Sequence, residues 1–258
     1  MSTLRQRSLA VLLEPDPGRK AALARDLDRF DGIGADEVLA EPAGIPGRPS
    51  RPALVPHTEI KQRSIKSPDG LAALMHALAH IEFNAINLAA DVTWRFAGMP
   101  DAFYLDWMKV AREEAYHFGL LSERLVELGH AYGDFPAHNA LWDMAEKTRH
   151  DLLARLALVP RTLEARGLDA SPPIRNKLVS VGDQRGAQIL DIILRDEIGH
   201  VAIGNHWYGV LCAERGLDPV ATYAALAARH GAPRLRGPFN LAARRAAGFS
   251  EEELARLT

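Results

Sequence analysis

Apolar residues recur every three to four positions along most of this chain, which is the spacing of amphipathic helices. No stretch shows the strict alternation of apolar and polar residues that predicts a half-buried strand. The clearest helix is predicted over residues 68–97. Ser67 is a suitable N-cap, Pro68 suits the first helical position, and Asp69 adds an acid to the first turn. The pattern therefore predicts an all-α fold.

Glycine and proline residues divide the rest of the chain into further helices. A third long helix is predicted over 139–166, with Pro160 expected to kink or break it and Gly167 expected to end it. The other predicted helices are one or two short ones within 4–30, then 101–128, 174–181, a long helix from the Asp183 cap to 215, one from the Asp218-Pro219 cap to 229, one from 239, and a last one starting at Ser250.

Residues 31–66 contain five prolines and no helical pattern, so we expect an irregular arm. Such an arm is either disordered or laid across the surface of the helices that follow. The sequence therefore predicts three parts in one structural unit. Residues 1–66 would form N-terminal helices and the arm, 67–216 a four-helix bundle, and 217–258 a C-terminal helical extension.

Acidic and histidine residues interrupt the apolar stripe of two predicted helices in the same way. One helix carries Glu-Glu-Ala-Tyr-His at 113–117, and the later one carries Asp-Glu-Ile-Gly-His at 196–200. A glutamate and a histidine three residues apart lie on one face of a helix, about one turn apart. Each glutamate–histidine pair can therefore offer a carboxylate and an imidazole to the same metal ion.

A lone glutamate also lies in the apolar stripe of the helix before each pair. Glu82 precedes Glu114 by 32 residues. Glu164 precedes Glu197 by 33 residues, so the chain reads as two similar helical hairpins. One glutamate–histidine pair could arise by chance. The alternative to a metal centre is a degenerate, metal-free bundle. The repeated pattern predicts that six residues converge on one two-metal centre: Glu82, Glu114, His117, Glu164, Glu197 and His200.

The charges and donor atoms of these six residues favour particular metals. Four carboxylates neutralise two divalent ions, and two imidazoles complete a set without thiolate, which suits iron or manganese better than structural zinc. Glu114 and Glu197 are expected to bridge the two ions. Glu82 and Glu164 are expected to be terminal ligands. Open coordination positions would remain for water, dioxygen or substrate.

The acids directly before the two paired glutamates, Glu113 and Asp196, are candidates for orienting the histidines. Metal-bound histidines usually donate their other N–H to a carboxylate. Asp196 is therefore expected to orient His117. Glu113 is expected to orient His200. The alternative is that both acids are ordinary polar helix residues.

Other residues are candidates for a pocket beside the metals. Gly204, one turn after His200, is expected to leave space there. His76 and His80 lie on a polar row of the first long helix, and we expect surface or interhelical contacts from them rather than metal ligation. The pocket candidates, for each of which core packing is the alternative, are Tyr104, Trp107, Gly204 and Tyr208.

The composition indicates a packed soluble protein, since 47% of the 258 residues are hydrophobic and 25% are charged. The single cysteine, Cys212, excludes an internal disulfide and a multi-cysteine metal site, and it fits a reducing cytoplasm. The apolar run near the N-terminus is too short for a signal peptide. The longest uncharged stretch, 198–213, is too short to span a bilayer. We expect a cytoplasmic protein that does not enter the membrane.

The net charge of -2 gives no general support for nucleic-acid binding. Five arginines and no acid occur between 229 and 245, and we expect a solvated basic face there, with an anion site as the alternative. They are also the sole support for an RNA substrate. The five are Arg229, Arg234, Arg236, Arg244 and Arg245.

With these motifs the chain resembles the ferritin-like di-iron carboxylate superfamily, and more closely a bacterial ferritin-like family of unknown function. The likeness lies in Glu-Ala-Arg-Gly-Leu-Asp at 164–169, Arg-Asp-Glu-Ile-Gly-His-Val at 195–201 and Gly-Pro-Phe-Asn at 237–240. It covers most of the chain from residue 67 onward, with all six ligand positions filled. The resemblance implies a ferritin-like four-helix bundle with two iron ions, manganese being acceptable in one or both positions, and dioxygen-dependent redox chemistry.

The first function considered is a di-iron oxidase or monooxygenase acting on an unidentified small organic substrate. The sequence has no glycine-rich nucleotide loop, so electrons would come from an external donor or from the substrate. A homodimer is compatible with this function. The alternatives are a ferroxidase or iron-handling protein, a tRNA-modifying hydroxylase, and a binding protein with a vestigial site. The long N- and C-terminal additions disfavour the hollow cage that iron storage needs.

Overall fold

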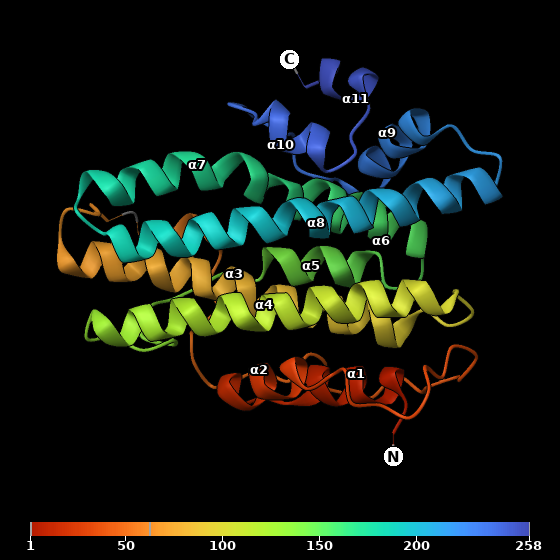
Figure 1. Cartoon of the computed structure of the whole chain (residues 1–258), viewed down its shortest axis with the longest axis horizontal. Coiled ribbons are helices and arrows are strands. Elements are labelled where there is room, and N and C mark those ends of the chain that lie inside the picture. The colour runs from red at the N-terminus through yellow and green to blue at the C-terminus, as the bar shows by residue number, and fades with distance from the viewer. Residues whose placement is uncertain (1, 62, 258) are drawn as a thin grey trace. The chain divides into compact units, whose positions relative to one another are not determined.

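The computed structural model describes residues 2–61 and 63–257, and most of this part of the chain is helical (Figure 1). The all-α prediction is confirmed, because the described residues contain no strand beyond one isolated bridge between Leu54 and Ala137. A 3₁₀ turn, η1, covers His57–Glu59, and a π-helix, η2, covers Val159–Glu164. The α-helices are α1 (Leu4–Leu13), α2 (Pro17–Arg25), α3 (Pro68–Arg95), α4 (Asp101–Glu127), α5 (Ala140–Lys147), α6 (Leu152–Leu158), α7 (Ala165–Ser180), α8 (Gln184–Glu214), α9 (Pro219–His230), α10 (Leu241–Ala246) and α11 (Glu251–Ala255).

The helices belong to two compact units, Met1–Trp142 (unit 1) and Asp143–Thr258 (unit 2). Unit 1 contains α1 to α4, unit 2 contains α6 to α11, and the short α5 crosses the boundary. The finer division of the chain into an arm, a bundle and a C-terminal extension stays a prediction.

Several helices begin at the caps that the sequence predicts. Ser67, Asp183, Asp218 and Ser250 each accept a hydrogen bond from the backbone N–H three residues later. Asp16 caps α2 in the same way, so residues 4–30 hold two short helices, α1 and α2. Each cap satisfies an N–H group that has no partner inside its helix. Short polar residues therefore set the start of most of the described helices.

Unit 1 is built on the antiparallel hairpin of α3 and α4 (Figure 1). Gly98 lies in the connection with a φ of 77°, a left-handed conformation that glycine adopts without strain. Its N–H donates to the carbonyl of Ala35 in the arm at 2.9 Å. Apolar side chains of both helices are buried, including Met75, Ile86, Trp107, Val110 and Leu121.

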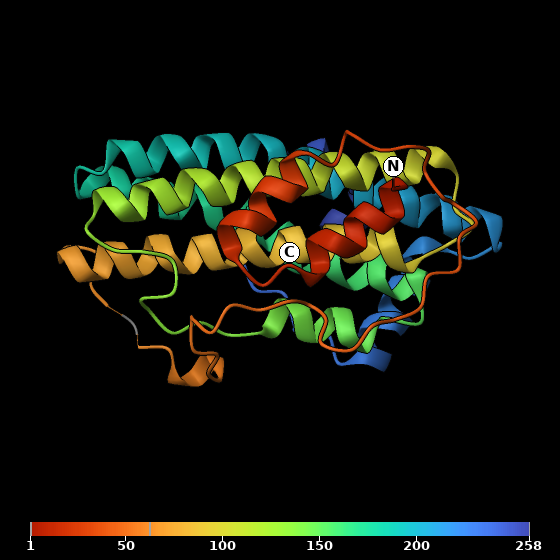
Figure 2. The ribbon, with the colours of Figure 1, turned by 90° about the horizontal axis from the view of Figure 1, so that it is seen from below.

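A row of polar side chains along α3 is also buried. Lys20 of α2 is fully buried and donates to Asn87 Oδ1 and to the carbonyl oxygens of Leu12, at 3.2 Å, and Gly47, at 3.1 Å. Figure 2 shows α1 and α2 lying across the α3–α4 hairpin. The N-terminal helices and the arm therefore attach to α3 through hydrogen bonds. The buried polar row consists of His76, His80, Asn84, Asn87 and Asp91.

Unit 2 is built on a second hairpin, in which α6, η2 and α7 run along α8 (Figure 1). The chain turns at Gly182, whose φ is 84°, and Asp183 then caps α8. The helix α10 packs against α7 and α8, which fixes the C-terminal part of the chain to this hairpin. The buried residues of this contact are Ala165, Leu168, Val201, Ala243 and Ala247.

The limits predicted for the helix over 139–166 are wrong. The helix α5 ends at Lys147, and α6 begins after its own N-cap, Asp151. The helical rod then continues through η2 into α7, past Gly167. Gly167 does not end the helix, since α7 continues to Ser180. The carbonyl of Gly167 accepts a hydrogen bond from Ser171 Oγ at 2.7 Å.

The separate helix predicted over 174–181 is also wrong, because α7 continues through Pro172 and Pro173. A proline at 172 has no N–H to donate to the carbonyl of Leu168. Asn240 Nδ2 donates to that carbonyl instead, at 3.2 Å. A side chain 72 residues later in the chain therefore satisfies an acceptor that the proline leaves open.

Pro160 breaks the α-helix, as its position predicts. The helix α6 ends at Leu158, and the π-helix η2 follows. A proline removes a backbone donor and crowds the preceding turn, whereas a π turn accommodates an extra residue. The wider turn ends at Glu164, one of the predicted metal ligands.

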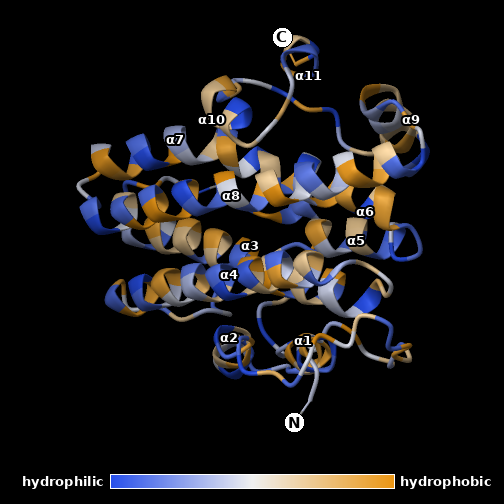
Figure 3. Ribbon diagram, turned by 45° about the vertical axis from the view of Figure 1, so that its right-hand side comes forward, coloured by the Kyte–Doolittle hydropathy of each residue, from blue (hydrophilic) through white to orange (hydrophobic). Residues whose placement is uncertain are grey.

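Hydropathy along the long helices is mixed (Figure 3). Hydrophilic and hydrophobic residues alternate around α3, α4, α7 and α8, as in helices with one apolar face. No helix in the described part of the chain is both long and apolar enough to cross a membrane.

Gly204 of α8 packs so closely on Pro160 that a larger residue should destabilise unit 2. A Cβ atom at position 204 would lie 2.5 Å from Pro160 Cβ. We expect Gly204→Ala to lower the free energy of unfolding in urea by about 1–3 kcal/mol, as overpacking does. Gly209→Ala in the same helix is the control, because a Cβ there meets nothing within 4 Å. The control should be neutral or stabilise by up to about 1 kcal/mol, and equal effects of both changes would contradict the packing argument.

Candidate metal centre

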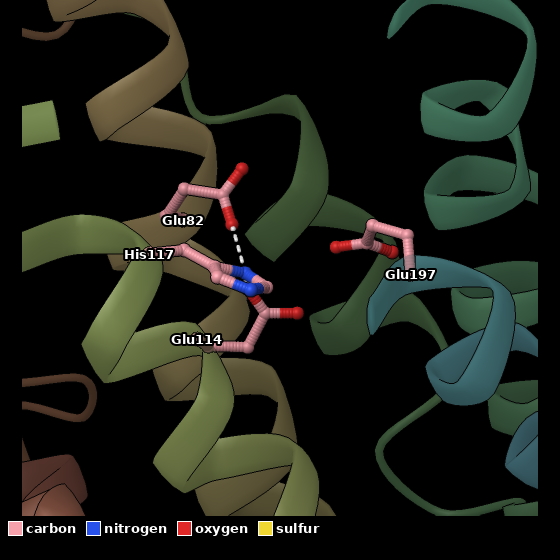
Figure 4. Close-up of side chains that lie close together, drawn as sticks. All are labelled: Glu82, Glu114, His117 and Glu197. Atoms are coloured by element: carbon pink, nitrogen blue, oxygen red, sulfur yellow. Dashed lines mark hydrogen bonds and ion pairs between the residues drawn. The ribbon is translucent and has the colours of Figure 1, made fainter. Parts of the chain in front are cut away.

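Unit 1 brings together three of the predicted ligands, Glu82 from α3 and Glu114 and His117 from α4 (Figure 4). His117 Nδ1 lies 3.2 Å from Glu82 Oε2 and 3.5 Å from Glu114 Oε2. One donor atom of each residue lies within 4.8 Å of the others. The hairpin explains why these residues lie close together, because Glu82 and Glu114 are each 16 residues from Gly98 in the turn.

The two carboxylates of this cluster are buried, with exposed fractions of 4% for Glu82 and 1% for Glu114. Burial, together with the charge of Glu114, raises the pKa of Glu82. Burial alone would lower the pKa of His117, but its hydrogen bonds to Glu114 and Glu82 outweigh this effect and raise it. One imidazolium thus faces two buried carboxylates. Without a further cation, the cluster keeps either a negative charge or a carboxyl proton.

Unit 2 carries the second glutamate–histidine pair. Glu197 and His200 lie one turn apart in α8, with His200 Nδ1 3.6 Å from Glu197 Oε1. Both residues are buried, and within residues 2–61 and 63–257 no group forms a hydrogen bond to Glu197 Oε2. Glu164, the third predicted ligand of this unit, lies at the end of η2, and its Oε2 is buried.

These residues fit a divalent metal ion. Carboxylate and imidazole ligands bind such ions at about 2.0–2.2 Å, so neighbouring ligand atoms lie roughly 3 Å apart. The separations of 3.2 and 3.5 Å in unit 1 are close to this value. A cation would also provide the positive charge that buried carboxylates require. The convergence of all six residues on one two-metal centre stays a prediction.

Glu113 and Asp196 each pair with a residue of their own helix. Glu113 Oε2 lies 3.6 Å from Lys109 Nζ. Asp196 accepts two hydrogen bonds from Arg195, at 2.8 and 3.0 Å. Their role in orienting the histidines stays a prediction.

The residues considered for a substrate pocket have packing roles. The Tyr104 hydroxyl donates to the carbonyl of Phe96, the residue that follows α3, at 2.9 Å. The Tyr208 hydroxyl donates to the carbonyl of the first residue of α9, at 2.7 Å. Trp107 is buried and packs edge-on against a neighbouring phenylalanine. The open space predicted beside Gly204 is wrong, because the ring of Pro160 occupies it.

His76 and His80 hold the loop that follows α4. The N–H of Gly133 donates to His76 Nε2 at 2.9 Å. His80 Nδ1 lies 2.8 Å from the Tyr132 hydroxyl. Burial lowers the pKa of each histidine to about 4, so both are neutral at pH 7. These are contacts between elements, of the kind that the sequence predicts.

Arg244 does not belong to the solvated basic face that the sequence predicts. It is fully buried, and its Nε and Nη2 donate to Asp169 of α7 at 3.0 and 2.6 Å. The prediction is wrong for this residue because its partner lies 75 residues earlier, where no local pattern reveals it. The other four arginines of the group are exposed: Arg229, Arg234, Arg236 and Arg245.

The fold and the site define an all-helical protein with a buried carboxylate–histidine cluster in its first unit. The chain belongs to the family described as Protein of unknown function (DUF455), whose model matches residues 13–255. An uncharacterized protein of Haemophilus influenzae is 50% identical over 213 residues, which cover 80% of this chain and 74% of that protein. No solved structure matches the chain at a significant level.

Replacing Glu82 by glutamine should have opposite effects on stability and on metal binding. The variant removes a buried carboxyl that must either keep a like charge beside Glu114 or take up a proton on folding, so the metal-free protein should gain about 1 kcal/mol in free energy of unfolding. The folded state of the wild type holds a proton that the unfolded state releases, because the pKa of Glu82 is raised. Stability of the metal-free wild type should therefore fall as the pH rises above the ordinary range of a glutamate, and Glu82→Gln should show a smaller slope.

Thermal unfolding in the presence of a chelator measures the stability of both proteins across this pH range. Competition with a chromogenic chelator measures their affinity for ferrous or manganous ion, which Glu82→Gln should lower by at least about ten-fold. Glu123→Gln, at an exposed glutamate of α4, is the control and should change neither quantity. Unchanged metal affinity in Glu82→Gln would exclude Glu82 as a ligand.

Proposed function

We propose that this protein is a non-haem di-iron oxidoreductase that uses dioxygen to oxidise or hydroxylate a small organic substrate. Manganese is acceptable in one or both metal positions. The supporting observation is the buried cluster of Glu82, Glu114 and His117, in which two carboxylates lie close together and are shielded from water. The partner that faces both carboxylates is an imidazole, which is itself a metal ligand.

In this proposal the three predicted ligands of unit 2 complete the same two-metal centre. The order of a lone glutamate followed by a glutamate–histidine pair occurs once in each unit, with separations of 32 and 33 residues. Glu114 and Glu197 would bridge the ions. Glu82 and Glu164 would each bind a single ion, as would each histidine. The resemblance to ferritin-like bundles supports this arrangement, since those bundles build such centres from facing helices.

The metal pair, when bound, supplies the redox chemistry and the open coordination positions that dioxygen needs. The residues of the chain would bind the two ions and orient them. Buried carboxylates hold positive charge in a place that bulk water does not reach. The α3–α4 hairpin holds Glu82 opposite His117 in advance, so little conformational entropy is lost when an ion enters.

The electrons must come from a separate reductase or from the substrate. The chain has no glycine-rich loop that would hold a nucleotide cofactor. An external electron donor is therefore part of the proposal.

Anaerobic loading of the full chain with ferrous iron tests the proposed function. Elemental analysis should find two irons per chain, and an oxygen electrode should record dioxygen consumption when oxygenated buffer is added. Glu114→Ala and Glu197→Ala should each lose at least half of the iron and the oxygen uptake, while Glu123→Gln should keep both. Absence of redox-metal uptake under reducing conditions would overturn the proposal.

The same preparation distinguishes an oxidase from an iron-handling protein. An oxidase should consume dioxygen faster when a small-molecule fraction of cell extract supplies its substrate. An iron-handling protein would instead keep oxidising added iron into a ferric mineral, which light scattering detects. Gel filtration adds a second criterion, because a large hollow shell would favour storage.

Loading with manganous ion tests whether the two units share one centre. Two ions bridged by carboxylates are magnetically coupled, and their electron paramagnetic resonance spectrum differs from that of isolated ions. We expect the coupled spectrum in the wild type and its loss in Glu197→Ala. A spectrum of isolated ions in the wild type would reject the shared centre while leaving metal binding intact.

A further inference from the structure

We propose that unit 2 binds a small organic anion, with a phosphate or carboxylate group on a flat apolar body, in a cavity formed by α9, α10, α11 and the segments that join them. Figure 1 labels these three helices. The cavity volume is about 570 Å³, which lies within the range of small-molecule sites. None of its lining residues is a predicted metal ligand, so this site is separate from the proposed metal centre.

Arg244 lines one wall of the cavity. Its side chain is fully buried, with Nε and Nη2 held by Asp169. In the described part of the chain, Arg244 Nη1 has no hydrogen-bond partner, although it is buried. Buried polar groups without a partner are rare and costly, so this nitrogen indicates a missing acceptor.

Arg161 of η2 lines the same cavity. Its exposed fraction is 4%. Arg161 Nε donates to Asn205 Oδ1 at 2.6 Å, and Nη2 donates to Glu253. Arg161 Nη1 is buried and, among residues 2–61 and 63–257, meets no acceptor. Two buried guanidinium groups of the lining thus each keep one nitrogen without an acceptor in the described part of the chain.

Aromatic rings hold both guanidinium groups in place. The Arg244 guanidinium lies 5.4 Å from the ring centre of Phe239 and 5.3 Å from that of Phe249. The Arg161 guanidinium lies 4.1 Å from the ring centre of Tyr208 and 5.4 Å from that of Phe249. Stacking of this kind restricts the arginines without using their N–H groups. An incoming anion would therefore meet positive charges that are already held in position.

The charge of the lining favours an anion over a cation. Four arginines and one glutamate line the cavity, and the glutamate, Glu253, already pairs with Arg161. Arg234 and Arg256 are exposed and lie at the cavity, where they can attract and contact a negative group. Planar guanidinium groups match the geometry of phosphate and carboxylate oxygens.

The remaining walls indicate the body of the ligand. Ala224, Ala227 and Ala228 of α9 line one side, and their small side chains leave room beside the helix. Rings of Phe239 and Phe249 line the cavity as well. Small apolar walls and ring faces suit a flat ring with a charged substituent, rather than a free inorganic ion.

Fluorescence of anilinonaphthalene sulfonate, a flat aromatic anion, provides the test on the full-length protein. We expect the probe to bind at a saturable site and to be displaced by phenyl phosphate and by benzoate. Uncharged phenol at the same concentration should not displace it. Stronger competition by phenyl phosphate would identify a phosphate ligand, and stronger competition by benzoate a carboxylate. Equal displacement by phenol would overturn the anion assignment.

Substitutions at the cavity distinguish this site from other apolar surfaces. Arg234→Gln removes an exposed arginine of the lining and should weaken the displacement by phenyl phosphate about ten-fold. Arg236→Gln, at an exposed arginine outside the lining, is its control and should leave the displacement unchanged. These exposed positions avoid the risk that Arg161 or Arg244 variants fail to fold.

Filling the cavity gives an independent test. Ala227→Leu places a larger side chain in the lining and should abolish probe binding. Ala225→Leu, at an exposed residue of α9 outside the lining, should bind the probe like the wild type. Circular dichroism confirms that both variants are folded. Retention of wild-type probe affinity by both Ala227→Leu and Arg234→Gln would reject this cavity as the anion site.

Discussion

Two carboxylates buried beside one imidazole are the constraint on which the first unit depends. Glu82 and Glu114 repel each other, and burial removes the water that would screen them. Apolar residues at these two positions would stabilise the fold more than buried charges do. Apolar side chains occupy most other buried positions of α3 and α4. The hairpin supplies the rigidity that keeps the charges together, because its apolar face is packed and its turn is anchored by Gly98.

The rest of unit 1 packs against that hairpin and reinforces it. The helices α1 and α2 and the arm do not cover α3 with apolar side chains alone. Lys20 joins three segments through hydrogen bonds, and Arg95 links Asp91 to Glu41 of the arm at 2.7 and 2.9 Å. Buried polar contacts of this kind require one specific docking geometry, so the N-terminal segment also fixes the position of the helix that carries Glu82.

Local sequence signals predicted most of the helix starts and the grouping of Glu82, Glu114 and His117, whereas contacts between distant residues were not predicted. Caps such as Ser67 and Asp183 act within one turn, so the sequence reveals them. The spacing from Glu82 to Glu114 likewise depends on a single turn. In contrast, α7 passes through Pro172 because of Asn240, and Arg244 is buried because of Asp169. Asn240 lies 72 residues from Leu168, whose carbonyl it satisfies, and Arg244 lies 75 residues from Asp169, so no periodic pattern encodes either pairing.

The π-helix η2 carries one residue that lines the proposed anion cavity and one predicted metal ligand. Arg161, which stacks on Tyr208, and Glu164, a predicted ligand, lie within the same widened turn of six residues. A backbone with this irregular hydrogen bonding has no rigid α-helical turn between the two side chains. The same turn of backbone therefore positions both the guanidinium and the carboxylate. Any coupling between ligands at its two ends would be mutual, because thermodynamic linkage requires each ligand to change the affinity of the other by the same factor.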